Sequence, residues 1–347
     1  MTYDAQLELG LDTFGDVTVD ETGTPLPQHQ VIRDVLEQAV LADQVGIDVF
    51  NVGEHHRDDF AISAPDMVLA AAASRTERIK LGTAVTVLSS DDPIRVYQRF
   101  ATLDALSNGR AEVTLGRGSF TESFPLFGLD LADYEVLFEE KLELFAALRT
   151  EEPVSFNGTT RAPLAPTRVY PGTAAGSLPA WVGVGGSPES VVRAARLGFP
   201  LMLAIIGGEP TRFAPFTDLY RRATAQFGTG TLPVGVHSPG FVAATDSDAQ
   251  ELLFPHFKAN RDRIGAERGW PPATRIQFDQ EVRHGALFVG SPDTVARKIA
   301  DTVRALGLQR FDLKYSNGPL PHAHLMECVR LYGEEVAPRV RRLLAAD

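Results

Sequence analysis

The stretch IKLGTAVTVLSSDDPIRVYQRFATLDALSNGRAEVTL, residues 79–115, holds one complete strand–helix–strand unit. Its apolar run at 79–88 predicts a buried strand, and the amphipathic segment at 93–106 predicts the helix that follows. A second apolar run at 111–115 predicts the next strand. Strands that alternate with helices in this way are typical of a parallel sheet.

The same alternation runs through the rest of the chain. We expect eight strands, at residues 7–13, 49–53, 79–88, 111–115, 180–184, 201–206, 234–243 and 311–315. We expect helices at residues 28–45, 65–75, 93–106, 133–149, 188–197, 211–227 and 322–344, with a long irregular stretch after Asp246. Eight strand–helix pairs favour a closed (β/α)8 TIM barrel, an α/β fold, over an open doubly wound sheet.

Two segments exceed what a barrel needs, within a single domain that we expect to span residues 1–347. Residues 150–178 are rich in Pro, Gly and Thr, and the four residues 156–159 could form a tight hairpin turn. Residues 254–288 have little periodicity. Such insertions either cap the carboxyl-terminal face of a barrel or form solvated loops, and the sequence leaves both open.

Composition excludes several classes of protein. The chain of 347 residues has a formal net charge of -12, which repels nucleic acid and anionic membranes. Its one cysteine, Cys328, cannot form an intramolecular disulfide or a cysteine metal cluster. No stretch approaches the roughly 20 apolar residues of a membrane span. Without a basic segment and apolar run at its start, we expect a cytoplasmic protein.

Barrel enzymes carry their chemistry at the carboxyl ends of the strands, so the residues after each apolar run are the candidates. Four such places contain glycine or polar residues: Gly53-Glu54-His55-His56-Arg57, Ser89-Ser90-Asp91-Asp92-Pro93, Gly116-Arg117-Gly118-Ser119 and Gly185-Gly186-Ser187-Pro188.

The turn Gly185-Gly186-Ser187 fits a phosphate site. Two glycines allow close backbone approach, and the helix that follows presents its free N–H groups. The alternative is a helix capped by its own Ser187 and Glu189, because a carboxylate in the first turn repels an anion. Arg117 favours the phosphate, since a guanidinium binds it bidentately and offsets that carboxylate. Arg117 could equally form a surface salt bridge.

His55 and His56 are adjacent, so on a strand they would point to opposite faces and could not easily hold one metal ion. No His-x-His or His-Glu-x-x-His spacing occurs in the sequence. We therefore expect no metal site. A histidine at a barrel mouth can exchange a proton with a substrate near neutral pH, and the alternative is a histidine that only supports its neighbours by hydrogen bonds.

In order along the chain, several of these motifs resemble the bacterial-luciferase-like family of flavin-dependent oxidoreductases. The resemblance rests on Gly53-Glu54-His55-His56, on residues 81–88 leading to Asp92-Pro93-Ile94-Arg95, and on residues 103–110. It continues through Leu115-Gly116-Arg117-Gly118 and the Gly-Gly-Ser turn to Phe288-Val289-Gly290-Ser291-Pro292. It thus covers nearly the whole chain.

The resemblance implies a barrel that binds reduced FMN, or in one branch the deazaflavin F420, across its carboxyl-terminal mouth. Ala84 and Val85 match a bulge of the third strand, often a non-proline cis peptide, on which the flavin ring rests. The family's phosphate contacts match Arg117, Ser119, Gly185, Gly186, Ser187 and Ser190. His55 matches the histidine that assists the chemistry. Luciferases have a cysteine where this chain has Gly116 and an acid where it has Gly185, so we do not expect light emission.

The expected function is a monooxygenase in which reduced FMN and O2 act on a small organic substrate. A separate NAD(P)H:flavin reductase is the expected partner, because no convincing NAD(P)-binding unit is visible. The alternatives are an F420-dependent dehydrogenase that transfers hydride, a catalytically silent flavin-binding protein and, more distantly, a metal hydrolase. The sequence does not name the substrate. The apolar, small-residue segment 67–73 further predicts a homodimer.

Overall fold

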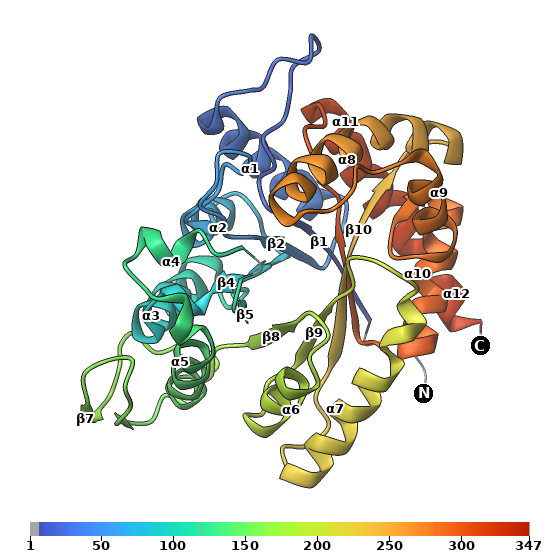
Figure 1. Cartoon of the computed structure of the whole chain (residues 1–347). Helices are drawn as coiled ribbons and strands as arrows, with labels where there is room; N and C mark the ends of the chain where they lie inside the picture. Colours follow the sequence, from blue (N-terminus) through green and yellow to red (C-terminus); the bar gives the residue numbers. More distant parts are fainter. Residues whose placement is uncertain (1–6, 119, 347) are drawn as a thin grey trace.

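Eight parallel strand positions, which we call staves, form the body of the computed structural model (Figure 1). The structure describes residues 7–118 and 120–346. The strands of this sheet are β1 (Glu8–Thr13), β2 (Val49–Val52), β3 (Lys80–Thr83), β4 (Thr86–Val87), β5 (Val113–Gly116), β8 (Ala180–Val184), β9 (Leu201–Ala204), β10 (Val234–Val242), β11 (Phe288–Gly290) and β12 (Arg310–Lys314). β3 and β4 together make the third stave, and β11 pairs only with β10.

The staves lie side by side in the order in which they follow one another in the chain. β1 pairs in parallel with β2 on one side and with β12 on the other. A parallel bridge between Leu81 and Ala111 joins β3 to the residues before β5, and β4 pairs with β5 further along. The sheet is therefore nearly closed, and the predicted (β/α)8 barrel is confirmed. The predicted strand 79–88 is interrupted by a cis peptide bond between Ala84 and Val85.

Helices surround this barrel on the outside (Figure 1). They are α1 (Gln28–Gln44), α2 (Pro65–Ala73), α3 (Pro93–Ser107), α4 (Ser123–Leu126), α5 (Tyr134–Leu148), α6 (Pro188–Arg196), α7 (Ala214–Phe227), α8 (Asp246–Arg268), α9 (Arg275–His284), α10 (Pro292–Leu306), α11 (His322–Leu331) and α12 (Ala337–Ala345). Ser187 and Ser291 cap α6 and α10 as their sequences indicate. Within the described residues, no helix is long and apolar enough to cross a membrane.

Along the strands, apolar side chains alternate with polar ones or glycine. Leu9 and Leu11 of β1 are fully buried among the core residues. Asp12, on the other face of the strand from Leu11, points into the barrel and contacts His237. At the amino-terminal end the interior is filled by charge. The Nε of Arg310 is 2.9 Å from the nearer carboxylate oxygen of Asp312, and its Nη1 contacts Glu112 on the opposite side of the barrel. This ionic group, Arg310, Asp312, Glu112 and Asn51, closes that end.

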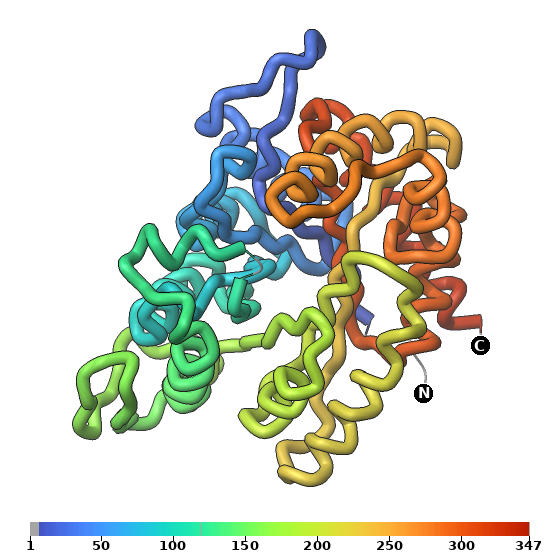
Figure 2. The backbone as a smooth tube through the Cα atoms, viewed as in Figure 1, coloured from blue at the N-terminus to red at the C-terminus, as the bar shows by residue number. Residues whose placement is uncertain are grey.

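Residues 254–288 are not irregular, so that expectation is wrong. They belong largely to α8 and α9, which lie together at one side of the molecule (Figure 2). The threonine Thr274 forms a capping box with Gln277 at the start of α9, a local signal that the sequence contains. Because α8 follows β10, this insertion stands at the carboxyl ends of the strands.

Residues 150–178 form a hairpin of two short antiparallel strands, β6 (Val154–Phe156) and β7 (Leu164–Thr167). The turn at 156–159 is not tight, because seven residues, 157–163, separate the strands. The segment connects α5 to β8 and contacts the outer helices. Arg161 lies 3.5 Å from Asp92, the residue before α3. It therefore packs on the outer wall, away from α8 (Figures 1 and 2).

Candidate active site

The bulge at Ala84 and Val85 lies at the mouth of the barrel. Both residues are partly exposed, although Thr83 before them and Thr86 after them are buried. The side chain of Val85 packs against two glycines of neighbouring strands, since a Cβ at Gly116 would come within 2.5 Å of it and a Cβ at Gly183 within 3.0 Å. With Val85 in this position, a side chain at Gly116 would displace it, which favours glycine there.

His55 points into a cluster of aromatic rings at this mouth. Its ring centroid lies 4.9 Å from that of Phe14, 4.4 Å from that of Phe60 and 5.2 Å from that of Phe120. Its Nδ1 is 3.7 Å from a carboxylate oxygen of Glu122. Burial raises the pKa of Glu122, but the interaction with His55 and a backbone amide outweighs burial and lowers the pKa overall. His55 is thus a histidine with a nearby anion in apolar surroundings.

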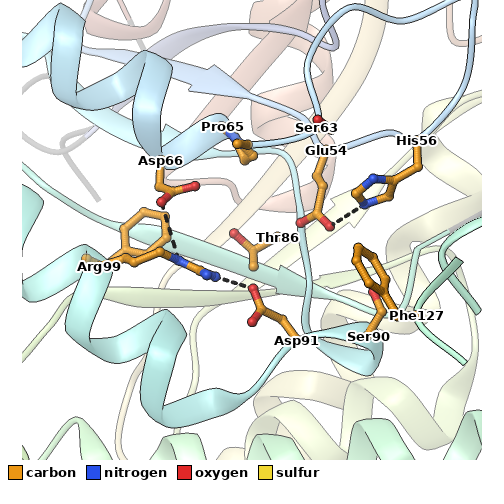
Figure 3. Close-up of a pocket in the computed structure, with 12 residues that line it drawn as sticks. Glu54, His56, Ser63, Pro65, Asp66, Thr86, Ser90, Asp91, Arg99 and Phe127 are labelled. Carbon is orange, nitrogen blue, oxygen red and sulfur yellow. Dashed lines mark hydrogen bonds and ion pairs between the residues drawn. The ribbon is translucent and has the colours of Figure 1, made fainter. Parts of the chain in front are cut away.

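His56 points the other way, as expected for adjacent residues. Its Nε2 lies 3.0 Å from one oxygen of Glu54, and the other oxygen of Glu54 accepts a 2.9 Å hydrogen bond from the backbone N–H of Val87 (Figure 3). The hydrogen bond to Glu54 raises the pKa of His56, against the effect of burial. Glu54 therefore ties the loop after β2 to the strand segment that follows the bulge.

The side chains of Glu54 and His56 line a cavity of about 310 Å³. Figure 3 shows Arg99 reaching across it between Asp66 and Asp91. The carboxylate of Asp66 is 3.4 Å from Arg99 Nε. Because two carboxylates neutralise the one guanidinium, the cavity offers no free cation for a phosphate.

The turn at Gly185 leaves open space. No described atom lies within 4 Å of where a Cβ of Gly185 would be, and Gly186 has a φ of +108°, which favours glycine. Ser187 caps α6, because its hydroxyl oxygen accepts a 3.3 Å hydrogen bond from the N–H of Ser190. The same hydroxyl donates to Glu189, 2.8 Å away. Helix α6 is therefore capped by its own residues, as one alternative predicts, and the turn before it also leaves the open space that the other alternative needs.

Arg117 is linked to α6, the helix after this turn, through a shared carboxylate. It forms an ion pair with Glu135 of α5, and Arg193 of α6 lies 3.5 Å from the other oxygen of Glu135. Glu135 is 63% exposed, while Arg193 is only 11% exposed. The guanidinium of Arg117 also stacks over the ring of Tyr134, 5.1 Å from its centroid. Two arginines thus share one carboxylate, although Arg193 also lies 3.6 Å from Glu139, and the sequence predictions did not include Arg193. Ser119 lies outside the described residues.

The end of α8 is fastened over the loop that follows β2. Glu267 of α8 accepts two hydrogen bonds from Arg57, of 2.6 and 2.8 Å. The guanidiniums of Arg57 and Arg268 both lie over the ring of Phe120, 4.6 and 4.9 Å from its centroid. The insertion therefore covers part of the mouth beside His55.

The fold and this arrangement define a class: a parallel α/β barrel with its candidate chemistry at the carboxyl ends of the strands. The family model for the luciferase-like monooxygenases matches residues 13–310. The chain therefore belongs to that family and is an enzyme of the monooxygenase class.

Individual relatives agree with this assignment. The chain is 25% identical over 337 residues to the alkanal monooxygenase alpha chain of Photorhabdus laumondii, which covers 93% of this chain and 87% of that protein. It is 37% identical over 152 residues to limonene 1,2-monooxygenase of Rhodococcus erythropolis, 42% of this chain and 39% of that protein.

Solved structures share the fold. A monooxygenase from Streptomyces bottropensis superposes with a TM-score of 0.81 at 24% identity, covering 96% of this chain and 99% of that one. The oxygenating constituent of 3,6-diketocamphane monooxygenase from a Pseudomonas putida plasmid, in complex with FMN, has a TM-score of 0.76 at 21% identity, with the same coverage.

Proposed function

We propose that the chain is a flavin-dependent monooxygenase that uses reduced FMN and O2 on a small organic substrate. The observation that carries the proposal is the pair Arg117 and Arg193, which hold one exposed carboxylate; Arg193 lies on α6, the helix that follows the open glycine turn. Two guanidiniums around a single anion are a typical phosphate arrangement, because each donates charged hydrogen bonds.

The residues present fit an FMN phosphate. Glu135 is 63% exposed, so its side chain can turn into solvent and leave its place between the arginines to a phosphate. The phosphate carries more charge than the carboxylate it replaces, and Gly185 leaves room beside it. Arg117, Arg193, Gly185, Gly186, Ser187 and Ser190 would hold the phosphate, and Ala84 and Val85 would carry the ring.

Reduced FMN would supply the electrons with which O2 is reduced and one oxygen atom is transferred. The protein would position the substrate, and the aromatic cluster around His55 together with the end of α8 would exclude water. His55, with Glu122 at 3.7 Å to balance a positive charge, would donate or accept a proton at its ring nitrogen.

A flavin of this kind needs a source of electrons. We propose a separate NAD(P)H:flavin reductase for this role, and a second copy of the chain as the partner in a homodimer. F420 remains the alternative cofactor, because a secondary alcohol dehydrogenase that binds an F420 adduct has the same fold with a TM-score of 0.74. A silent flavin-binding protein would bind FMN without turnover.

The test compares cofactors and then turnover. FMN and F420 are titrated into the protein and followed by flavin fluorescence, and reduced FMN is then mixed with O2 and a panel of ketones, aldehydes, aromatics and sulfonates. We expect tighter binding of FMN than of F420, and an oxygenated product with at least one substrate class. Preference for F420 would favour the dehydrogenase, and FMN binding with no product from any class would favour the silent protein.

A further inference from the structure

A second histidine faces the barrel mouth, on a strand that only β1 and β12 separate from β2, the strand before His55. His237 lies on β10, and its Nδ1 is 2.6 Å from a carboxylate oxygen of Asp12 on β1. Since β12 separates these two strands, the side chains meet inside the barrel. Asp12 is fully buried, whereas the side chain of His237 keeps 10% of its surface exposed.

This contact fixes the orientation of the imidazole. A buried carboxylate accepts the hydrogen of Nδ1, so the lone pair of neutral His237 is on Nε2. Among the described residues, Nε2 has no hydrogen-bond partner, and the second oxygen of Asp12 has none either. In the described part of the chain, the carboxylate of Asp12 therefore accepts a side-chain hydrogen bond only from this imidazole, and it can balance a positive charge on the ring.

The ring of His237 also belongs to the aromatic cluster. Phe14 stacks on it with centroids 5.9 Å apart and planes 6° apart, and Phe14 also makes an edge contact with His55. Ala204, the residue paired with His237 on β9, is partly exposed, so solvent reaches this part of the mouth. Lys314, whose Nζ lies 4.6 Å from the centroid of the Phe14 ring, is held 3.1 Å from Asp16.

We infer that His237, positioned by Asp12, is the base for a hydroxyl on an aromatic ring of the substrate. The aromatic cluster around Phe14 suits an aromatic ring that packs edge-on, because His237 already stacks on Phe14, and Nε2 of His237 is the free acceptor beside it. In the step, the O–H bond of the hydroxyl breaks, its electron pair stays on the oxygen and an N–H bond forms at Nε2. The resulting imidazolium is paired with Asp12. This inference rests on the proposed function for its reaction.

The probe is 4-nitrophenol, whose ionised form absorbs visible light. It is titrated into the wild-type protein with oxidised FMN present, across a range of pH. We expect the apparent pKa of the bound phenol to fall by about one unit or more, because its proton moves to a base paired with a carboxylate. His237→Gln should still bind the phenol but lose this shift, and Asp12→Asn should lose most of it. His322→Gln, a histidine bonded to Gln38 on the outside of the barrel, should behave as wild type.

A second measurement needs neither ligand nor variant. Nitrogen-15 NMR of the wild-type histidines should show His237 protonated at Nδ1 and unprotonated at Nε2. A proton on Nε2 instead, an unshifted phenol in the wild-type protein, failure of the phenol to bind, or an equal shift in His237→Gln would each overturn the inference. The FMN titration is read separately, so a protein that ionises the phenol without binding FMN would refute the proposed function and leave His237 as a base.

Discussion

Arg117 holds an exposed carboxylate, and we expect it to exchange that partner for the cofactor phosphate. A hydrogen bond to a charged group is worth about 1.5 to 3 kcal/mol, so Arg117→Ala should weaken FMN binding by roughly ten- to over a hundredfold. Riboflavin, which lacks the phosphate, should bind almost as before. Paired fluorescence titrations with the two ligands measure the difference.

The control for this change is Arg196→Ala. Arg196 stands at the end of α6 and pairs with Glu139 and Glu143 of α5, at 3.1 and 3.0 Å, but lies away from the turn. It should leave the affinity for FMN unchanged. Equal losses of FMN and riboflavin in Arg117→Ala, with folding checked by circular dichroism, would make Arg117 a structural salt bridge.

His56 should make the stability of the fold depend on pH. Its hydrogen bond to Glu54 raises its pKa above the ordinary value of 6.5. A raised pKa in the folded state adds stability below the unfolded value, and that stability is lost as the pH rises through the folded value. The free energy of unfolding lost in His56→Gln should therefore be larger at about pH 5.5 than at about pH 8.5.

Urea unfolding at the two pH values measures this difference. His322→Gln serves as the control, because His322 bonds to Gln38 and its neighbouring carboxylate, Glu37 at 3.5 Å, is exposed, whereas Glu54 is buried. A loss in His56→Gln that is the same at both pH values would contradict the assigned pairing of Glu54 with His56.

Local motifs predicted some site residues and could not predict others. His55 and Arg117 follow strands directly, so the barrel rule alone places them at the mouth. The contact between Asp12 and His237 joins residues 225 positions apart, and no local pattern signals it. Arg193 lies on the second turn of α6, where an arginine is ordinary, and only its distance to Glu135 marks it.

At the scale of elements, the strands were predictable because each is a short apolar run between glycine or polar residues. α8 was not, although it is 23 residues long. Pro255 lies inside it, and its apolar contacts come from its first half, where Leu253 and Phe257 pack on the core, whereas Glu267 near its end forms an ion pair with Arg57. Apolar residues confined to one half leave no apolar stripe along the whole helix.

α2 is the element on which the proposed dimer depends. Val68 and Leu69 are buried against the barrel, whereas Met67 is 67% exposed on the outer side. Met67→Lys should place a charge in the middle of the interface and shift a dimer to monomers. Light scattering at about 10 µM, a concentration at which a dimer of ordinary interface size should persist, measures the mass.

Another exposed apolar residue controls for the added charge. Ile276 of α9 is 71% exposed, and Ile276→Lys should leave the dimer intact. A wild-type protein that scatters as a monomer would refute the proposed partner, and a dimer that survives Met67→Lys would move the interface elsewhere.

For the whole molecule, the ionic group at the amino-terminal end is the part most sensitive to substitution. Arg310 is fully buried between Asp312 and Glu112. Removing one partner of a buried ion pair costs about 3 to 5 kcal/mol, because the other charges stay buried and unpaired. Arg310→Met should lower the free energy of unfolding by that amount, as measured by urea denaturation.

The exposed Arg330 provides the comparison. It pairs with Glu327 at 2.7 Å on the surface of α11, and Arg330→Met should cost less than about 1 kcal/mol. A similar small loss for Arg310→Met would mean that the buried carboxylates take up protons and do not need the guanidinium.

The same ionic group closes one end of the barrel interior among the described residues. Because charge fills the barrel at its amino-terminal end, we expect reactants and products to pass through the mouth at the carboxyl ends of the strands. In the proposed function, a cofactor seated on the bulge of the third stave lies deeper than a substrate placed above it. Binding would then be ordered. The flavin binds before the substrate, and the product leaves before the flavin can be exchanged with a reductase.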